Sequence, residues 1–191
     1  RSVMQSAYRI LVADNPVLLK KNTGNIWDSK KVISGESIQV IYNGKKLQSG
    51  KEYYWKVMVW DNKNVASGWS KPTAWQMGLL DREDWRGAQW IAYATLPDSL
   101  RSVPGIHGPG DPKLGPGKDI LPLLRKEFII KKTIKKATAF IAGLGHFDLM
   151  INGKKVGDHF LDAGWTQYSK DALYVTFDIT NQLKKGSNAI G

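Results

Sequence analysis

Acids, histidines and aromatic rings gather within residues 145–168, GHFDLMINGKKVGDHFLDAGWTQY, and their types fit more than one kind of chemistry. Two carboxylates that face one pocket can act as a general acid and a general base, with Asp148 and Asp158, or Asp158 and Asp162, as the pair. However, Asp148 lies only four residues before Asn152, where a turn is expected, and acids are common on the solvent face of a half-exposed strand. We therefore expect no catalytic residue in this chain.

Metal binding is a second chemistry to consider. His146 and His159, with the aspartates beside them, offer nitrogen and oxygen ligands, but no two histidines have the i, i+4 spacing of a helical ligand pair. Calcium at Asp111, Asp119 or nearby loop oxygens would require a loop of closely spaced oxygen ligands, which the sequence does not show. The chain has no cysteine, so thiolate ligands, thiol nucleophiles and disulfides are excluded. We assign no metal-binding residue and no cofactor, and leave calcium open.

Contact with a sugar ring is the third chemistry. Trp165 and Tyr168 lie in the loop-like stretch AGWTQY, close after Asp162, and an aromatic face suits the apolar face of a pyranose. These three are our candidate substrate-binding residues. The alternative, which the sequence favours, is that both rings pack beneath the loop as local core.

The segment that holds these residues is predicted to be a β-hairpin. Phe147, Leu149 and Ile151 alternate onto one face, and Asn152-Gly153 provides the positive backbone angles of a type I′ turn. Similar strand patterns occur in LLRKEFIIKK, IKKATAFIAGLG, ALYVTFDIT and, at the end of the chain, NQLKKGSNAIG. The fold class is therefore predicted to be all-β.

The chain divides into stretches of different character. Residues 1–80 are predicted to form a fibronectin type III-like sandwich, with room for about six strands instead of seven. Residues 81–93 are read as a connector and the first strand of a second domain, which spans residues 85–191. Residues 94–123 are rich in Pro and Gly without regular periodicity, and so predict a mobile insertion or a functional loop.

Two local patterns support the first sandwich. Leu47, Gly50 and Tyr53 have the spacing of the tyrosine corner, in which the hydroxyl group bonds upstream backbone. DNPVLLKKNTG predicts a short helix that Asp14 or Asn15 caps.

The stretch YYWKVMVWDNKN is predicted to be a strand. Alternation puts Tyr54, Lys56, Met58 and Trp60 on one face and the residues between them on the other. Most tryptophans are expected to pack, among them Trp27, Trp55, Trp75 and Trp90.

Composition narrows the class of protein. The 191 residues are 42% hydrophobic and 24% charged, which is globular composition, and no apolar run is long enough to span a membrane. The net charge of +11 suggests nucleic acid, but the lysines recur as isolated pairs beside turn residues and do not cluster on one helix or arm. We interpret the charge as solvated surface and expect no nucleic-acid partner.

The order of these segments resembles the N-terminal region of bacterial α-L-rhamnosidases. The first domain is similar in QSAYRILVA, WDSKKV, YYWKVMVWD and WSKPTAWQMGLL, and the second in DWRGAQWI, LLRKEF, AFIAGLGHFDLMINGKKVGDHFLDAGWTQYSK and LYVTFDIT. The resemblance implies a hydrolase that removes terminal α-linked L-rhamnose with inversion. It places the two catalytic acids in an (α/α)6 barrel further along the polypeptide and makes the second domain a jelly roll of the carbohydrate-binding-module type.

The resemblance also implies what this chain does. We expect a non-catalytic N-terminal fragment, with strands missing before Arg1 and beyond Gly191, that supports the catalytic domain and is inactive alone. Its expected partners are a rhamnose-containing glycan or glycoside and the catalytic domain, and bare strand edges predict self-association. A free-standing carbohydrate-binding or adhesion module is the alternative. The substrate class alone suggests a periplasmic or extracellular location.

Overall fold

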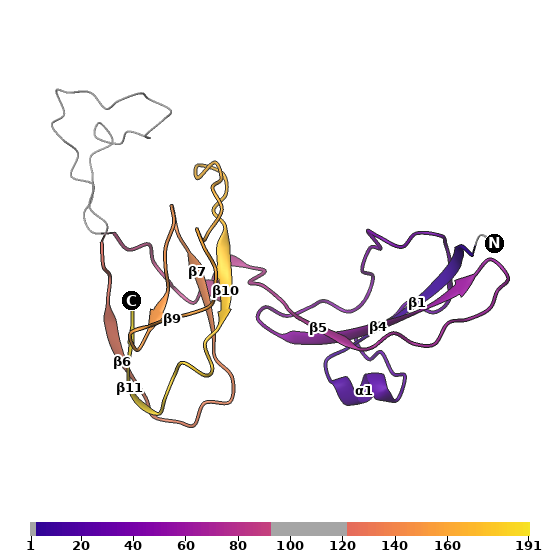
Figure 1. Ribbon diagram of the computed structural model, residues 1–191, viewed down its shortest axis with the longest axis horizontal. Coiled ribbons are helices and arrows are strands. Elements are labelled where there is room, and N and C mark those ends of the chain that lie inside the picture. Colours follow the sequence, from indigo (N-terminus) through magenta and orange to yellow (C-terminus); the bar gives the residue numbers. More distant parts are fainter. Residues whose placement is uncertain (1–2, 93–121) are drawn as a thin grey trace. The chain divides into compact units, whose positions relative to one another are not determined.

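The computed structural model describes residues 3–92 and 122–191, and these form two compact, strand-rich units, Arg1–Ala88 and Gln89–Gly191 (Figure 1). All the sheets are antiparallel, which confirms the all-β prediction. The insertion predicted at residues 94–123, with Asp111 and Asp119, lies outside the described residues except for its last two positions. Within the described ranges no helix is long and apolar enough to cross a membrane.

The first unit is built on one sheet with the strand order β2-β1-β4-β5, and β3 pairs with β1 as well. The strands are β1 (Gln5–Ala13), β2 (Trp27–Asp28), β3 (Val32–Ile33), β4 (Glu52–Asp61) and β5 (Thr73–Gln76). The long pair β1–β4 carries the unit, because its register runs from Gln5 opposite Asp61 to Ala13 opposite Tyr54. The described part of residues 1–80 thus has five strands, where about six were predicted.

The helix α1 (Pro16–Lys20) packs against β1 and β4 (Figure 1). Asn15 caps it, because its side-chain oxygen accepts a hydrogen bond of 2.9 Å from the backbone N–H of Val17, and Pro16 occupies the first turn. Leu19 is fully buried in a cluster with Leu11 and Ala13 of β1. The predicted helix is therefore confirmed, with Asn15 as its cap.

The tyrosine corner is present. The side chain of Tyr53 is 1% exposed, and its hydroxyl oxygen accepts a hydrogen bond of 2.9 Å from the backbone N–H of Gln48. This contact fixes the loop before β4 to the strand itself, as the spacing of the sequence predicted.

The first unit ends in the 3-10 helix η1 (Arg82–Trp85). The carboxylate of Asp84 accepts a hydrogen bond of 3.0 Å from the backbone N–H of Asp81. It also accepts one from the hydroxyl of Ser49. Residues 88–92 form no strand. The side chain of Trp90 is 63% exposed there, so the prediction that this indole packs is wrong.

The second unit has two sheets, one of β7 and β10 and one with the order β6-β11-β8-β9. The strands are β6 (Lys126–Ile130), β7 (Thr138–Ala142), β8 (Met150–Ile151), β9 (Lys154–Lys155), β10 (Tyr174–Asp178) and β11 (Gly186–Ile190). Side chains from both sheets meet in one buried cluster: Leu149, Ile151, Val156, Phe177 and Ile179. Two sheets around one core make this unit a sandwich.

The predicted hairpin forms the middle of this unit. Asn152 and Gly153 have φ angles of 51° and 77°, as a type I′ turn requires, and Ile151 pairs with Lys154 across it. Leu149 and Ile151 are buried, and Phe147 packs against the same core. The predicted alternation is confirmed, although the regular strand β8 is only two residues long.

Candidate functional site

The candidate residues lie in two loops of the second unit. One is the loop of residues 143–149 between β7 and β8, and the other is the loop of residues 156–173 between β9 and β10. A backbone hydrogen bond of 2.8 Å from the N–H of Phe147 to the carbonyl of Asp162 joins them. The two loops therefore lie side by side, and we treat them as one site.

The aromatic residues of the site are exposed. The side chain of Trp165 is 75% exposed and that of Tyr168 is 40% exposed. The prediction that both rings pack beneath the loop as local core is therefore wrong. One contact of the indole is with the imidazole of His146, which is stacked on it at 24° with 5.7 Å between the ring centroids.

The carboxylate of Asp162 is held in place from the same loop. Its Oδ2 lies 2.9 Å from Nδ1 of His159, and its side chain is only 20% exposed. The imidazole of His159 in turn packs on the buried ring of Phe177, with centroids 5.3 Å apart. Phe177 thus anchors the pair to the core of the unit.

The other two acids do not share this environment. Asp148 makes an ion pair of 2.7 Å with Lys155 across the hairpin, and its side chain is 55% exposed. Asp158 is an exposed residue. Within the described residues, no three or more His, Asp or Glu side chains gather in a way that could hold a metal ion.

The same loop carries three exposed apolar side chains. Phe160, Leu161 and Leu173 are 84%, 54% and 47% exposed. Leu173 lies against the backbone of Gly164, because a Cβ atom there would be 3.4 Å from its Cδ1. The two loops therefore present a flat aromatic surface, exposed apolar side chains and one oriented carboxylate. Groups of these kinds can stack on a sugar ring and accept hydrogen bonds from its hydroxyl groups.

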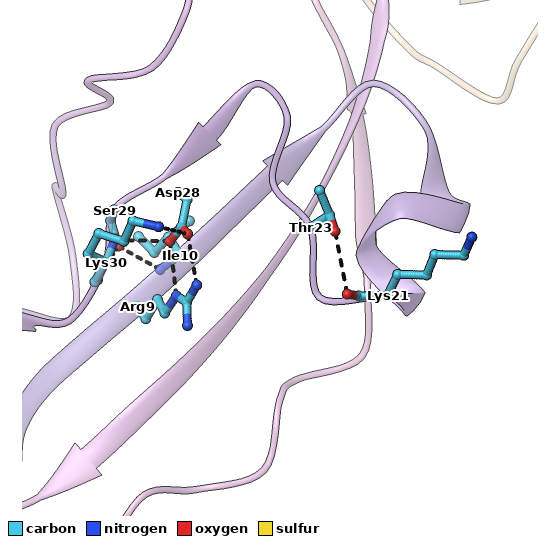
Figure 2. A network of polar contacts seen from close by, with 7 residues as sticks. All are labelled: Arg9, Ile10, Lys21, Thr23, Asp28, Ser29 and Lys30. Atoms are coloured by element: carbon cyan, nitrogen blue, oxygen red, sulfur yellow. Dashed lines mark hydrogen bonds and ion pairs between the residues drawn. The ribbon is translucent and has the colours of Figure 1, made fainter.

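A second polar cluster lies on the first unit and is a salt-bridge network (Figure 2). The guanidinium of Arg9 donates hydrogen bonds of 2.9 and 2.8 Å to the two carboxylate oxygens of Asp28, and Nζ of Lys30 lies 2.8 Å from one of them. The pKa of Asp28 lies far below its usual range, mainly because of the hydrogen bond from Arg9. Both cations contact the one carboxylate of Asp28, so we assign these contacts to the stability of the β1–β2 pair.

Two family models match the chain, one after the other. Residues 1–81 match the "Rha78A-like, N-terminal immunoglobulin domain", and residues 132–191 match the "Alpha-L-rhamnosidase N-terminal domain". An α-L-rhamnosidase of Formosa agariphila is 40% identical over 189 residues, or 98% of this chain. The chain belongs to the α-L-rhamnosidase family. It corresponds to the N-terminal region of that family, because both matching models describe N-terminal domains.

Solved structures of α-L-rhamnosidases share this fold. One from Dictyoglumus thermophilum aligns with a TM-score of 0.78 at 35% identity and covers 100% of this chain, and one from Aspergillus terreus aligns with a TM-score of 0.67 at 26% identity and covers 98%. The chain spans about a fifth of the length of these relatives, with 20% of the Formosa protein and 21% and 19% of the two structures. The sandwich predicted as fibronectin type III-like matches an immunoglobulin domain, which has the same architecture.

The sequence did not reveal what His146 and His159 do, although both were considered as metal ligands. The exposure of His146 was predictable, because the alternation that turns Phe147 inward turns its neighbour outward. The partners of the two histidines were not predictable. The contact between His146 and Trp165 depends on how the loops on either side of the β8–β9 hairpin pair with each other.

Proposed function

We propose that this chain is the accessory N-terminal region of an enzyme that hydrolyses terminal α-L-rhamnose from glycans or glycosides. The catalytic domain would lie on the same polypeptide, outside these residues. The observation that carries the proposal is the match of nearly the whole chain to α-L-rhamnosidases, over only about a fifth of their length. The two units would brace the catalytic domain.

The test compares two proteins on one substrate. The full-length gene product is expected to release nitrophenol from p-nitrophenyl α-L-rhamnopyranoside, and the purified chain of 191 residues is expected to release none. Release by the chain alone would show that the catalytic groups lie within it. A full-length product that cleaves other aryl glycosides but not this one would contradict the proposed substrate.

We further propose that Asp162, Trp165 and Tyr168 contact a sugar. The exposed indole, the oriented carboxylate and the partly exposed phenol support this proposal. Titration of the chain with L-rhamnose should change its tryptophan fluorescence at millimolar sugar, and Trp165→Ala should remove that change. Trp90→Ala is the matched control, because Trp90 is an exposed indole of the same unit. An equal response in wild type and Trp165→Ala would exclude Trp165 from the contact.

A further inference from the structure

We infer that His146 is a positioning residue for ligand binding, which backs one face of the Trp165 indole and leaves the other face for the ligand. The inference rests on the proposed sugar contact of Trp165 and adds a residue to it. The ligand class is a pyranose whose apolar face stacks on the free side of the indole.

The first support is the geometry of the two rings. They stack at 24° with centroids 5.7 Å apart, while the indole remains 75% exposed. Stacking on one side only restrains an aromatic ring without burying it. An indole that is already held in its binding orientation loses less conformational entropy when a ligand binds.

The second support is that the imidazole comes from a firmly held part of the chain. His146 precedes Phe147, whose ring packs against the buried ring of Phe177 at 6.3 Å, and whose N–H bonds the carbonyl of Asp162 at 2.8 Å. Both loops are therefore tied to the core next to the stacked pair. Because the backbone directly after His146 is fixed, the imidazole can hold the indole in one orientation.

The third support is that the same anchor holds the polar candidate. Phe177 also carries the ring of His159, which bonds the carboxylate of Asp162. Phe177 thus contacts both Phe147, the neighbour of His146, and His159, the partner of Asp162. A sugar site needs its stacking surface and its hydrogen-bond acceptor at a fixed distance and orientation, and packing of the supporting side chains provides this.

The test measures L-rhamnose binding by calorimetry and the environment of Trp165 by fluorine NMR. The chain is labelled with 5-fluorotryptophan, the Trp165 resonance is assigned with Trp165→Phe, and the other seven of the eight tryptophans report on folding. We expect His146→Ala to weaken binding about five-fold and to shift the Trp165 resonance alone, since an aromatic pair contributes about 1 kcal/mol. His146→Phe, which keeps a ring at this position, should restore both readouts. Leu144→Ala, an exposed side chain of the same loop, should change neither.

The outcomes separate this inference from the proposed function. If the wild-type chain binds L-rhamnose and His146→Ala binds it equally well, the inference is overturned and the sugar contact stands. If the wild-type chain does not bind the sugar, both are overturned. A loss in His146→Ala that His146→Phe does not restore would also overturn it, because stacking would then not be the cause.

Discussion

At the scale of single residues, Lys56 lies in an environment that the sequence pattern did not predict. Alternation placed it on a face with Tyr54 and Trp60, yet its side chain is only 5% exposed. Its Nζ donates hydrogen bonds of 2.5 Å to the carbonyl of Leu19 and the side-chain oxygen of Asn22. The ammonium also lies 4.7 Å from the ring centroid of Trp69. Lys56 thus ties β4 to the end of α1.

Replacing Lys56 with methionine should destabilise the first unit by about 1–3 kcal/mol at pH 7, because the carbonyl of Leu19 and the side-chain oxygen of Asn22 lose a donor, the first of them in a buried hydrogen bond. Burial lowers the pKa of Lys56 below its ordinary 10.5. Between the lowered pKa of the folded chain and the ordinary value of the unfolded chain, the unfolded chain therefore binds more protons. The contribution of Lys56 to stability increases as the pH rises through that window.

Urea unfolding at pH 7 and pH 10 measures both the loss of stability in Lys56→Met and its pH dependence. Lys63→Met, at an exposed position, is the control. Equal stability of Lys56→Met and the control would contradict the prediction.

Asp28 is the second residue with a clear electrostatic role (Figure 2). Its pKa is depressed, chiefly by the hydrogen bond from Arg9, so the stabilisation is present above the unfolded value of about 4 and is lost as the pH falls toward the folded value. Asp28→Asn should cost about 1–2 kcal/mol at pH 7, because charge-assisted bonds are lost, and less below pH 4. Unfolding curves against pH test this, with the exposed Asp158→Asn as control. A cost that does not change with pH would show that the ion pair is not its source.

At the scale of elements, the sequence predicted what local chemistry determines. The cap at Asn15, the tyrosine corner and the Asn152-Gly153 turn each depend on a few neighbouring residues, and each is present. The site was harder to predict, because the exposure of Trp165 depends on how two loops pair through Phe147 and Asp162. For the same reason the burial of Lys56 was missed, since α1 is the element that covers it.

The tyrosine corner gives a prediction at this scale. Tyr53→Phe keeps the buried ring and its packing on Trp75 but removes the acceptor of the Gln48 N–H. We expect a loss of about 1–2 kcal/mol in the free energy of unfolding. Hydrogen exchange should show faster exchange at the Gln48 amide while the amides of β1 keep their protection. Tyr42→Phe, which removes a hydroxyl bonded to the carbonyl of Lys45 in an exposed loop, is the control. A larger loss in the control would contradict the special role of Tyr53.

At the scale of the whole molecule, the sheets end in strands that have a neighbour on one side only. β5 ends the sheet of the first unit, and β7 and β10 form a sheet of two strands, so among the described residues each has one edge without a strand partner. Such edges are templates for pairing with another chain. The net charge of +11 opposes this association through like-charge repulsion.

These two features predict self-association that depends on both protein and salt concentration. Because salt screens repulsion between like charges, sedimentation should show more dimer or larger species at 0.5 M than at 0.05 M NaCl. Thr176→Lys places a charge on the exposed side of β10 and should reduce the association. Ser187→Lys is the control, because β11 lies between β6 and β8 and has neighbours on both sides. If the chain is a monomer at every salt concentration, the edges do not pair. If the two lysine variants behave alike, the association takes place elsewhere.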